Sequence, residues 1–401
     1  MKLLYIVDAR SPTALSWISY FIQAGHVVHL VSTYPCGTVE GVASQYVVPV
    51  ALSNLYVQAG GVRNRQLGWL RKLLPVRVRT AIRQMAVPLT FSQAITRFQN
   101  IIEKVHPELI HAMRIPFEGI LATEAVKLIH DENPTGKSYP LLISVWGNDF
   151  TLHAQSTKTL AAQTRDVLNY CAALHTDCQR DQHLAVGLGF DSSKPKIVLP
   201  GGGGIRLDVF YPPVDEGAEQ TPPRIINSRG FRTYVCNDTF FQSIPMVIEK
   251  YPDARFICPG MQGESQAHAW VAELGIADNV ELLPAQSREQ MAELFRQAMI
   301  TLSMTTHDGT PNTLLEAMAC GCFPIAGDIV SLREWVTPGE NGILLDPHDA
   351  KKLARAIIQA LDQPELRRGA REKNLALVKE RAEYGKCMGE AEEFYMQLIK
   401  N

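Results

Sequence analysis

The chain alternates short apolar runs with amphipathic segments along almost its whole length. It opens with this pattern, since Leu3–Val7 reads as a strand, Thr13–Ala24 as a helix and Val27–Ser32 as a second strand. Two neighbouring strands joined through a helix run parallel, because antiparallel neighbours need only a tight turn. The alternation therefore predicts parallel sheets covered by helices, which is the α/β class.

The alternation falls into two blocks. The first block predicts further strands at 109–111, 141–145, 174–176 and 196–199. The second predicts strands at 224–227, 255–258, 280–283, 299–303, 323–326 and 342–345, and helices at 238–250, 267–274, 288–297, 313–320 and 350–361. Gly201–Gly204 and Pro222-Pro223 separate the blocks, and a chain of 401 residues is long enough for two domains. We expect two doubly wound domains, at 1–205 and 206–378.

Composition narrows the function classes. The net charge of −2 implies no general affinity for nucleic acid. The eight cysteines include no CxxC pair, so Cys320 and Cys322 read as buried packing residues and not as a metal or redox site. No apolar run approaches the roughly 18–20 residues that span a bilayer. Met1–Val7 reads as a strand and not as a targeting segment, which favours a cytoplasmic protein.

One basic and apolar stretch stands apart from this ordinary composition. Residues 63–83 read RNRQLGWLRKLLPVRVRTAIR, with arginines and lysines among leucine, valine and tryptophan. Such a mixture suits an anionic membrane surface, so the protein could be peripheral on the inner face of the membrane. A basic wall that binds an anionic acceptor, or two short helices with solvated arginines, would explain the same residues.

The residues 307–321, HDGTPNTLLEAMACG, combine a loop with a helix start. Glycine and proline mark the loop, good helix formers follow from Thr313, and Gly321 stands where a helix commonly ends. Asp308 lies in the loop and Glu316 about one turn inside the helix. Two acids near a helix start are often only partners of the helix dipole, but here they also flank amide groups suited to an anion.

This block resembles retaining glycosyltransferases of family 4, which carry two acids separated by seven residues and then Ala-Met-Ala-Cys-Gly. Asp308 stands where the family most often has Glu, and Glu316 takes the second position. The resemblance continues through Pro324, Asn341-Gly342 and the run 344–347. It implies the GT-B architecture, in which two Rossmann-like domains face each other across a cleft, with the helix at about 379–401 packed back on the first domain.

The resemblance assigns the donor side to the C-terminal domain. It implies that Glu316 binds the donor ribose, since a carboxylate can accept two hydrogen bonds from a diol, and that Asp308 contacts the transferred sugar. The residues that would line the sugar and diphosphate are Gly309, Thr310, Pro311, Asn312 and Thr313. The backbone of Leu283, Pro284 and Ala285 would hold the base of a UDP or GDP sugar.

Arg229 and Arg232 follow the first strand of the second domain. Arg229 matches a family arginine that binds the diphosphate, but Tyr234 stands where the family has a lysine, so Arg232 is the expected replacement. A guanidinium can hold phosphate oxygens with two parallel hydrogen bonds. Gly201–Gly204 lacks the G-x-x-x-x-G-K-[ST] pattern of a P-loop, so we interpret it as a hinge or linker, with direct contact to the diphosphate as the alternative.

Five residues are expected on the acceptor side, in the N-terminal domain. Arg10 and Ser11 form the loop after the first strand, although the family loop is usually rich in glycine. His111 ends a strand and faces either the cleft or the core. Asp149 and His153 follow the strand at 141–145, where Asp149 binds a ligand or caps a helix.

These observations predict a glycosyltransferase that moves a sugar from a nucleotide-diphosphate sugar to an acceptor hydroxyl, with retention of configuration. The resemblance implies a carbohydrate or lipid-linked acceptor in cell-envelope or exopolysaccharide synthesis, and neither a metal nor another cofactor. A sugar-nucleotide epimerase or a phosphorylase on the same fold would show the same donor motif. A non-catalytic carbohydrate-binding protein is the third alternative, because the first family Glu and the family Lys are both replaced.

Overall fold

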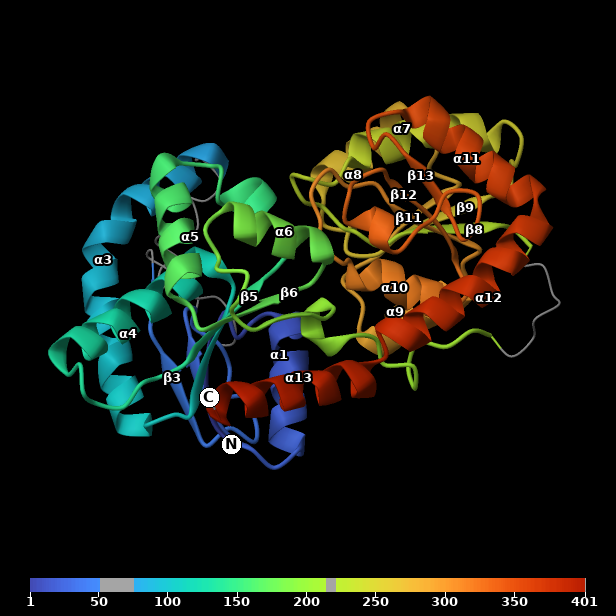
Figure 1. Cartoon of the computed structure of the whole chain (residues 1–401). Helices are drawn as coiled ribbons and strands as arrows, with labels where there is room; N and C mark the ends of the chain where they lie inside the picture. The colour runs from blue at the N-terminus through green and yellow to red at the C-terminus, as the bar shows by residue number, and fades with distance from the viewer. Residues whose placement is uncertain (51–75, 214–220, 401) are drawn as a thin grey trace. The chain divides into compact units, whose positions relative to one another are not determined.

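The computed structural model describes residues 1–50, 76–213 and 221–400, without the side chains of 76–90. The described chain divides into two compact units, each built on a parallel sheet (Figure 1). The first unit holds Met1–Thr176, Asp181–Val198 and Met388–Asn401, and the second holds Asp177–Arg180 and Leu199–Cys387. The predicted α/β class with two parallel sheets is confirmed.

The N-terminal sheet has seven strands in the order β3-β2-β1-β4-β5-β6-β7, all parallel. Its elements are β1 (Lys2–Val7), α1 (Pro12–Gln23), β2 (Val27–Ser32), β3 (Ser44–Val47), α3 (Val76–Val105), β4 (Leu109–Met113), a π-helical turn η2 (Ile115–Gly119), α4 (Ile120–Glu132), β5 (Leu141–Val145), a second π-helical turn η3 (Asp149–His153), α5 (Lys158–Tyr170), β6 (Ala173–Thr176), α6 (Gln179–Gly187) and β7 (Lys196–Val198).

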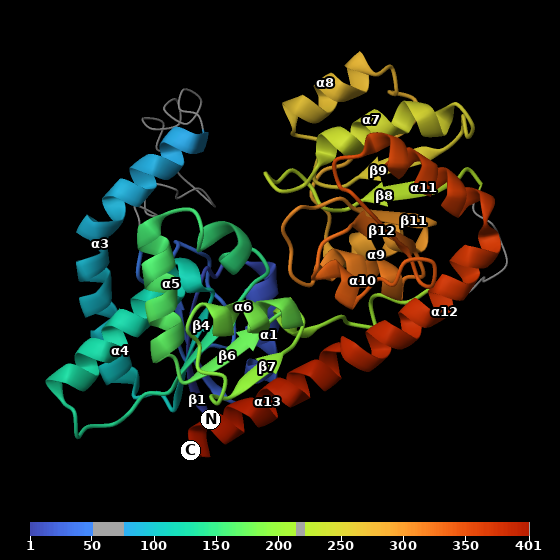
Figure 2. The same ribbon diagram turned by 45° about the horizontal axis from the view of Figure 1, so that its top comes forward.

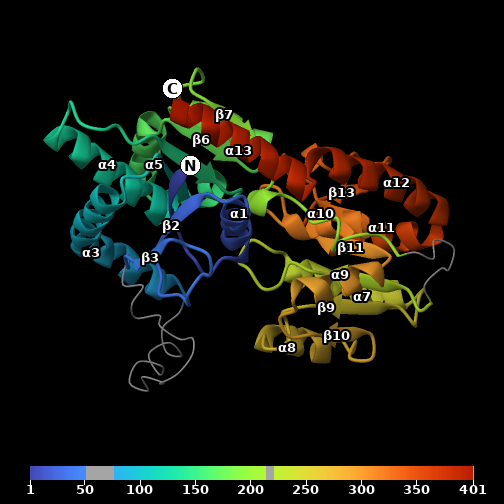
Figure 3. The same ribbon diagram turned by 90° about the horizontal axis from the view of Figure 1, so that it is seen from below.

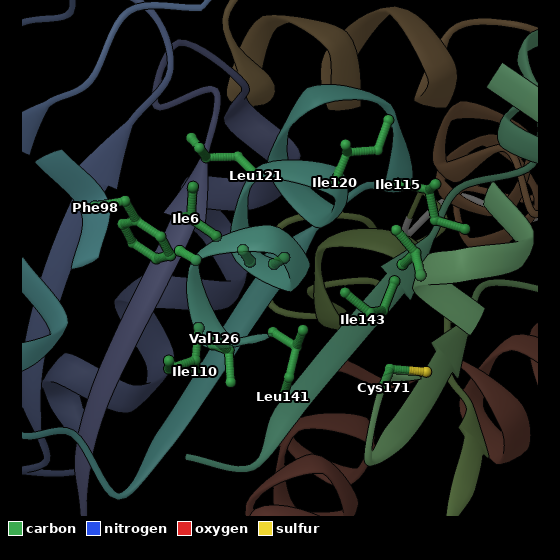
Figure 4. Close-up of a cluster of buried hydrophobic side chains, with 14 of the residues drawn as sticks. Ile6, Phe98, Ile110, Ile115, Ile120, Leu121, Val126, Leu141, Ile143 and Cys171 are labelled. Carbon is green, nitrogen blue, oxygen red and sulfur yellow. The ribbon is translucent and has the colours of Figure 1, made fainter. Parts of the chain in front are cut away.

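Alternate residues of each strand serve opposite faces of this sheet, as the two-residue period of a strand requires. Leu4 and Ile6 belong to the core that α3 and α4 close with Phe98 and Val126 (Figure 4). Tyr5 points to the other face, where α1 and the C-terminal helix cover the sheet (Figure 2). Burying each large apolar side chain contributes roughly 1.5–3 kcal/mol, so this two-sided core stabilises the unit.

The C-terminal sheet has six parallel strands in the order β10-β9-β8-β11-β12-β13. Its elements are β8 (Arg224–Asn227), α7 (Asn237–Ile248), β9 (Arg255–Cys258), α8 (Ser265–Glu273), β10 (Val280–Leu282), α9 (Arg288–Arg296), β11 (Ile300–Ser303), α10 (Asn312–Ala319), β12 (Phe323–Gly327), β13 (Ile343–Leu345), α11 (Ala350–Asp362) and α12 (Pro364–Arg381). Helix α13 (Tyr384–Lys400) follows and belongs to the first unit from Met388 onward. One core contains Phe240 and Phe256, and the core on the other face contains Phe295 and Leu314.

The strand order decides where each unit can bind a ligand. The order reverses between β1 and β4 in the first sheet and between β8 and β11 in the second. In open α/β sheets a ligand binds beyond the carboxyl ends of the strands at such a reversal, because the helices on its two sides leave the loops there uncovered. In the C-terminal unit, a ligand is therefore expected beside the residues that follow β8 and β11.

The last predicted helix differs from the structure, which has α12 and α13 in its place. Helix α12 ends at Arg381, and Ile205 forms a short parallel bridge with Glu383 through Ile205 N–Ala382 O (2.7 Å) and Tyr384 N–Ile205 O (3.0 Å). Gly204 lies against the Ala382 carbonyl with φ +99°, and a side chain there would collide with it. Helix α13 then continues until its turns from Met388 onward lie in the N-terminal unit (Figure 3).

Two further expectations concern membranes. In the part of the chain that the structure describes, no helix combines the length and apolarity needed to cross a bilayer. The basic stretch at 63–83 lies outside the described residues up to 75, and only the helical backbone of α3 is described for the rest of it. Its role stays a prediction.

Candidate functional site

Arg229 and Asp308 meet at the carboxyl edge of the C-terminal sheet, where the strand order reverses. Arg229 follows β8, Asp308 follows β11, and the two side chains form an ion pair through Nη2 and Oδ2. Arg229 also donates from Nη1 to Thr313 Oγ1 at 3.0 Å. The side chain of Arg229 is only 6% exposed, so its charge is largely removed from water and depends on these partners.

The loop that contains Arg229 is held by two asparagines. Asn227 Nδ2 donates to Asn237 Oδ1 at 3.2 Å, and Asn237 Nδ2 donates to the carbonyl of Gly230 at 3.0 Å. Gly230 has φ +64°, a conformation that glycine adopts without steric cost. These bonds explain how a short loop keeps a buried guanidinium at the end of β8.

The loop Asp308–Thr310 is fixed by residues from far along the sequence. Ser331 Oγ donates to the carbonyl of Asp308 at 2.7 Å, and Arg180 Nη1 donates to the same carbonyl at 2.6 Å. Trp335 Nε1 donates to Thr310 Oγ1 at 2.9 Å, and Thr310 Oγ1 donates to the carbonyl of Asp177 at 2.5 Å. The backbone of the predicted sugar-contact loop is therefore held in one position.

Gly309 and Pro311 have specific places in this loop. A side chain on Gly309 would collide with the carboxylate of Asp177, so that carboxylate would have to move to admit one. Pro311 is the residue that precedes α10, and Asn312 donates from Nδ2 to the carbonyl of Gly201 at 2.7 Å. Thr313 does not cap α10, because Pro311 takes the cap position and the Thr313 hydroxyl accepts from Arg229.

Glu316 lies in α10 and is half-buried. Burial raises the pKa of its carboxyl group from 4.5 to about 7, while the charges of Arg288 and Arg229 oppose this rise. Arg288 begins α9 and was not among the predicted site residues. The structure thus places Asp308, Glu316, Arg229 and Thr313 in one region, and adds Arg288, Arg180 and Ser331 to it.

Arg232 differs from Arg229 in its surroundings. Its side chain is exposed, and Nη1 donates to the hydroxyl of Tyr234 at 3.1 Å. The tyrosine that stands at the position of the family lysine therefore holds the arginine expected to replace that lysine. Both residues lie in the loop after β8, the loop that also carries Arg229.

Leu283, Pro284 and Ala285 follow the edge strand β10. The carbonyl of Leu283 accepts from the backbone of Gln262 at 3.0 Å, and the carbonyl of Pro284 accepts from the backbone of Gly260 at 3.1 Å. These bonds join the loops after β9 and β10 at the same carboxyl edge as Arg229. The predicted contact with a nucleotide base stays a prediction.

The acceptor-side residues lie in the N-terminal unit and separate into different environments. Arg10 is exposed, forms an ion pair with Asp8 at 2.8 Å and lies over the ring of Tyr34 at 3.8 Å. Ser11 caps α1 by accepting from the backbone of Ala14 at 3.4 Å. Both follow β1, at the carboxyl edge of its sheet.

His111 is buried in a hydrogen-bonded network and does not reach the surface. Its Nε2 is 2.6 Å from Ser144 Oγ, its Nδ1 is 2.5 Å from the hydroxyl of Tyr395, and Ser144 Oγ is 2.7 Å from His175 Nδ1. Trp17 Nε1 donates to the same Tyr395 hydroxyl at 2.9 Å. Burial lowers the pKa of His111, so a neutral ring links the sheet to the last helix.

Asp149 is buried and anchors Arg114, which follows β4. Arg114 Nη2 donates to Asp149 Oδ1 at 2.9 Å, and the backbone amide of Trp146 donates to Oδ2 at 3.2 Å. Asp149 therefore fixes the guanidinium of Arg114 and the turn at Trp146. It begins the π-helical turn η3 and does not cap an α-helix. Burial and the charge of Arg114 lower the pKa of the half-buried His153, while Asp149 opposes this shift.

Glu118 is a second buried acid that the sequence did not indicate. Thr33 Oγ1 donates to Glu118 Oε1 at 2.5 Å, and burial raises the pKa of this carboxyl group to about 7. It lies in the turn η2, in which Phe117 has φ +69° and the preceding Arg114 has φ +138°. Such strain in side-chain-bearing residues is common at functional sites.

A known family model matches the C-terminal unit of the chain. Residues 214–375 match the family model described as glycosyl transferases group 1. A D-inositol 3-phosphate glycosyltransferase of Mycolicibacterium smegmatis is 30% identical over 185 residues, which cover 43% of this chain and 41% of that protein. A GDP-mannose:cellobiosyl-diphosphopolyprenol alpha-mannosyltransferase of Xanthomonas oryzae is 29% identical over 117 residues, covering 28% of this chain and 30% of that protein. The matched segments thus span less than half the length of these relatives.

Solved structures match the whole chain. Sucrose-phosphate synthase from Thermosynechococcus elongatus superposes with a TM-score of 0.71 at 16% identity and covers 100% of both chains. HepE from Anabaena, in complex with UDP and glucose, also gives 0.71, at 14% identity over 99% of this chain and 100% of that one. These likenesses confirm the predicted GT-B fold.

Proposed function

We propose that this protein is a retaining glycosyltransferase of family 4 that transfers a sugar from a nucleotide-diphosphate sugar to an acceptor hydroxyl. The observation that carries the proposal is the buried Arg229 at the strand reversal, beside Asp308 and Glu316, inside the segment that matches the group 1 glycosyltransferase model. The matched relatives are named glycosyltransferases, and HepE has been solved with UDP and glucose.

The donor would bind the C-terminal unit through three kinds of contact. Glu316 accepts hydrogen bonds from the ribose diol, Arg229 donates to the diphosphate, and Asp308 accepts from a hydroxyl of the transferred sugar. Hydrogen bonds to charged groups contribute about 1.5–3 kcal/mol each. Arg229 and the amide groups at the start of α10 would stabilise the charge that develops on the leaving diphosphate.

We assign no side chain as the nucleophile or the catalytic base, and the departing phosphate is the proposed base. Because a guanidinium and helix amides supply positive charge at this position, we also propose that transfer needs no metal ion. Activity that persists in excess EDTA supports this statement, and activity that returns only with added Mg²⁺ or Mn²⁺ contradicts it.

The acceptor side would lie at the carboxyl edge of the N-terminal sheet. Arg10, Arg114, Asp149 and His153 follow β1, β4 and β5 there, together with Glu118. A carbohydrate or lipid-linked acceptor is proposed, in line with the diphosphopolyprenol acceptor named for the Xanthomonas relative. Sedimentation with anionic liposomes, compared between the native chain and a variant neutralised at 63–83, tests a peripheral membrane location.

The decisive experiment is a binding and transfer assay. Thermal shifts with UDP-, GDP- and ADP-sugars identify the donor, and mass spectrometry with carbohydrate and lipid extracts then detects the transferred sugar. Arg229→Ala should abolish both signals, whereas Arg333→Ala, which removes an exposed arginine paired with Asp328, should leave them unchanged. Conversion of the donor to its epimer without an acceptor would instead identify an epimerase.

A further inference from the structure

The guanidinium of Arg229 has hydrogen-bonding capacity that its protein partners do not use. Nη1 donates to Thr313 and Nη2 to Asp308, but Nε is buried and meets no acceptor in the described part of the chain. A buried donor without an acceptor costs about 1–3 kcal/mol. An oxyanion that approaches this edge of the guanidinium would remove that cost, so the geometry favours an anionic ligand at Arg229.

The same guanidinium is already neutralised by Asp308. A buried arginine that loses its counter-ion is strongly destabilised, so Asp308 stabilises Arg229 while no nucleotide is bound. Asp308 is one methylene shorter than the glutamate usual at this position, and its backbone carbonyl is held by Arg180 and Ser331. Only a rotation of its short side chain can therefore move the carboxylate away from Arg229.

We propose that Asp308 and the donor diphosphate bind Arg229 in turn. A diphosphate offers several oxygens and two negative charges, which suit the paired N–H groups of a guanidinium. When it takes over Arg229, the carboxylate of Asp308 is released and can accept a hydrogen bond from a sugar hydroxyl. This exchange rests on the proposed function and deepens it, because it makes sugar recognition depend on diphosphate binding.

The exchange predicts that Asp308 weakens the binding of a nucleoside diphosphate that carries no sugar. If the ion pair is formed in nine molecules of ten, apparent affinity is about tenfold lower than that of a free Arg229. Isothermal titration with UDP, GDP, ADP and pyrophosphate should therefore show about tenfold tighter binding to Asp308→Asn and to Asp308→Ala. The control Asp362→Asn breaks an exposed ion pair with Lys250 and should bind like the native protein.

The outcomes separate this proposal from the proposed function. Tighter binding by either folded Asp308 variant supports the exchange, and circular dichroism checks the fold of each. If the native protein binds a nucleoside diphosphate and both variants bind it equally well or more weakly, the exchange is overturned. The proposed donor binding is not affected by that result. If the native protein binds none of the nucleoside diphosphates, the proposed function and this inference are overturned together.

Discussion

We predict that the charge of Glu316 controls the affinity for the donor in the physiological pH range. Burial raises the pKa of this carboxyl group to about 7. Only the ionised form can accept hydrogen bonds from both hydroxyls of a ribose through both oxygens, since the neutral acid carries a proton on one of them. Lowering the pH through 7 should therefore weaken the binding of a nucleotide sugar.

The size of the effect follows from the fraction ionised. About nine-tenths of Glu316 is ionised at pH 8 and about one-tenth at pH 6, for a pKa near 7. The dissociation constant should then be about tenfold larger at pH 6 than at pH 8, which corresponds to roughly 1.4 kcal/mol. At pH 8, Glu316→Gln should lose about 1.5–3 kcal/mol of binding free energy.

Isothermal titration from pH 6 to pH 8 measures this dependence. The ligand is the tightest-binding nucleotide sugar of the UDP, GDP and ADP series, because its doubly esterified diphosphate does not titrate in this range. Glu316→Gln should bind weakly and with one dissociation constant throughout. Glu118 in the other unit has a carboxyl group with the same raised pKa, so Glu118→Gln is the matched control. This variant should keep the native pH dependence of donor binding. A native dissociation constant that does not change between pH 6 and 8 would refute the reasoning.

Three further predictions concern stability and the loop at Asp308. Folded Glu118 keeps a proton that the unfolded chain releases between pH 4.5 and 7, so its stabilising contribution is full below 4.5 and lost as the pH rises to 7. In urea titrations Glu118→Gln should therefore gain roughly 2–3 kcal/mol more at pH 8 than at pH 5, and equal changes at both would contradict this. Tyr395→Phe removes the buried partner of His111 Nδ1 and of Trp17 Nε1, so it should lower the free energy of unfolding by about 2–3 kcal/mol, whereas native stability would disprove the network. Trp335→Phe removes the bond to Thr310 and should lower kcat/KM about fivefold in a folded protein whose melting temperature falls, because the indole is buried, and native kcat/KM would show that this bond does not position the loop.

Local pattern predicted most of the fold. The apolar runs at β1, β4 and β5 are buried from end to end or nearly so, and their period and flanking turns were visible in the sequence. The short strand β3 was missed, because Ser44–Val47 is half-buried at the sheet edge and carries no apolar run. The break between α12 and α13 was also missed, since it depends on a bridge to Ile205, which lies far away in the sequence.

The candidate site likewise contains residues that a local motif predicted and residues that it did not. Asp308, Glu316 and Arg229 belong to one motif and one neighbouring loop, and the structure brings them together. Arg180 and Ser331 reach the loop at Asp308 from distant segments, so no local spacing could indicate them. The sequence left His111 facing either the cleft or the core, because the Tyr395 hydroxyl that binds its ring nitrogen comes from the end of the chain.

The bridge at Ile205 and the return of α13 mean that neither unit is a single stretch of sequence. An expression fragment that stops at Val198 would contain every strand of the first sheet but would lack Tyr395, so Trp17 and His111 would lose the hydroxyl that joins them. Separate production of the two halves would require the last segment, from Met388 onward, to be fused or supplied as a peptide. Deletion of that segment from the intact chain should destabilise the N-terminal unit.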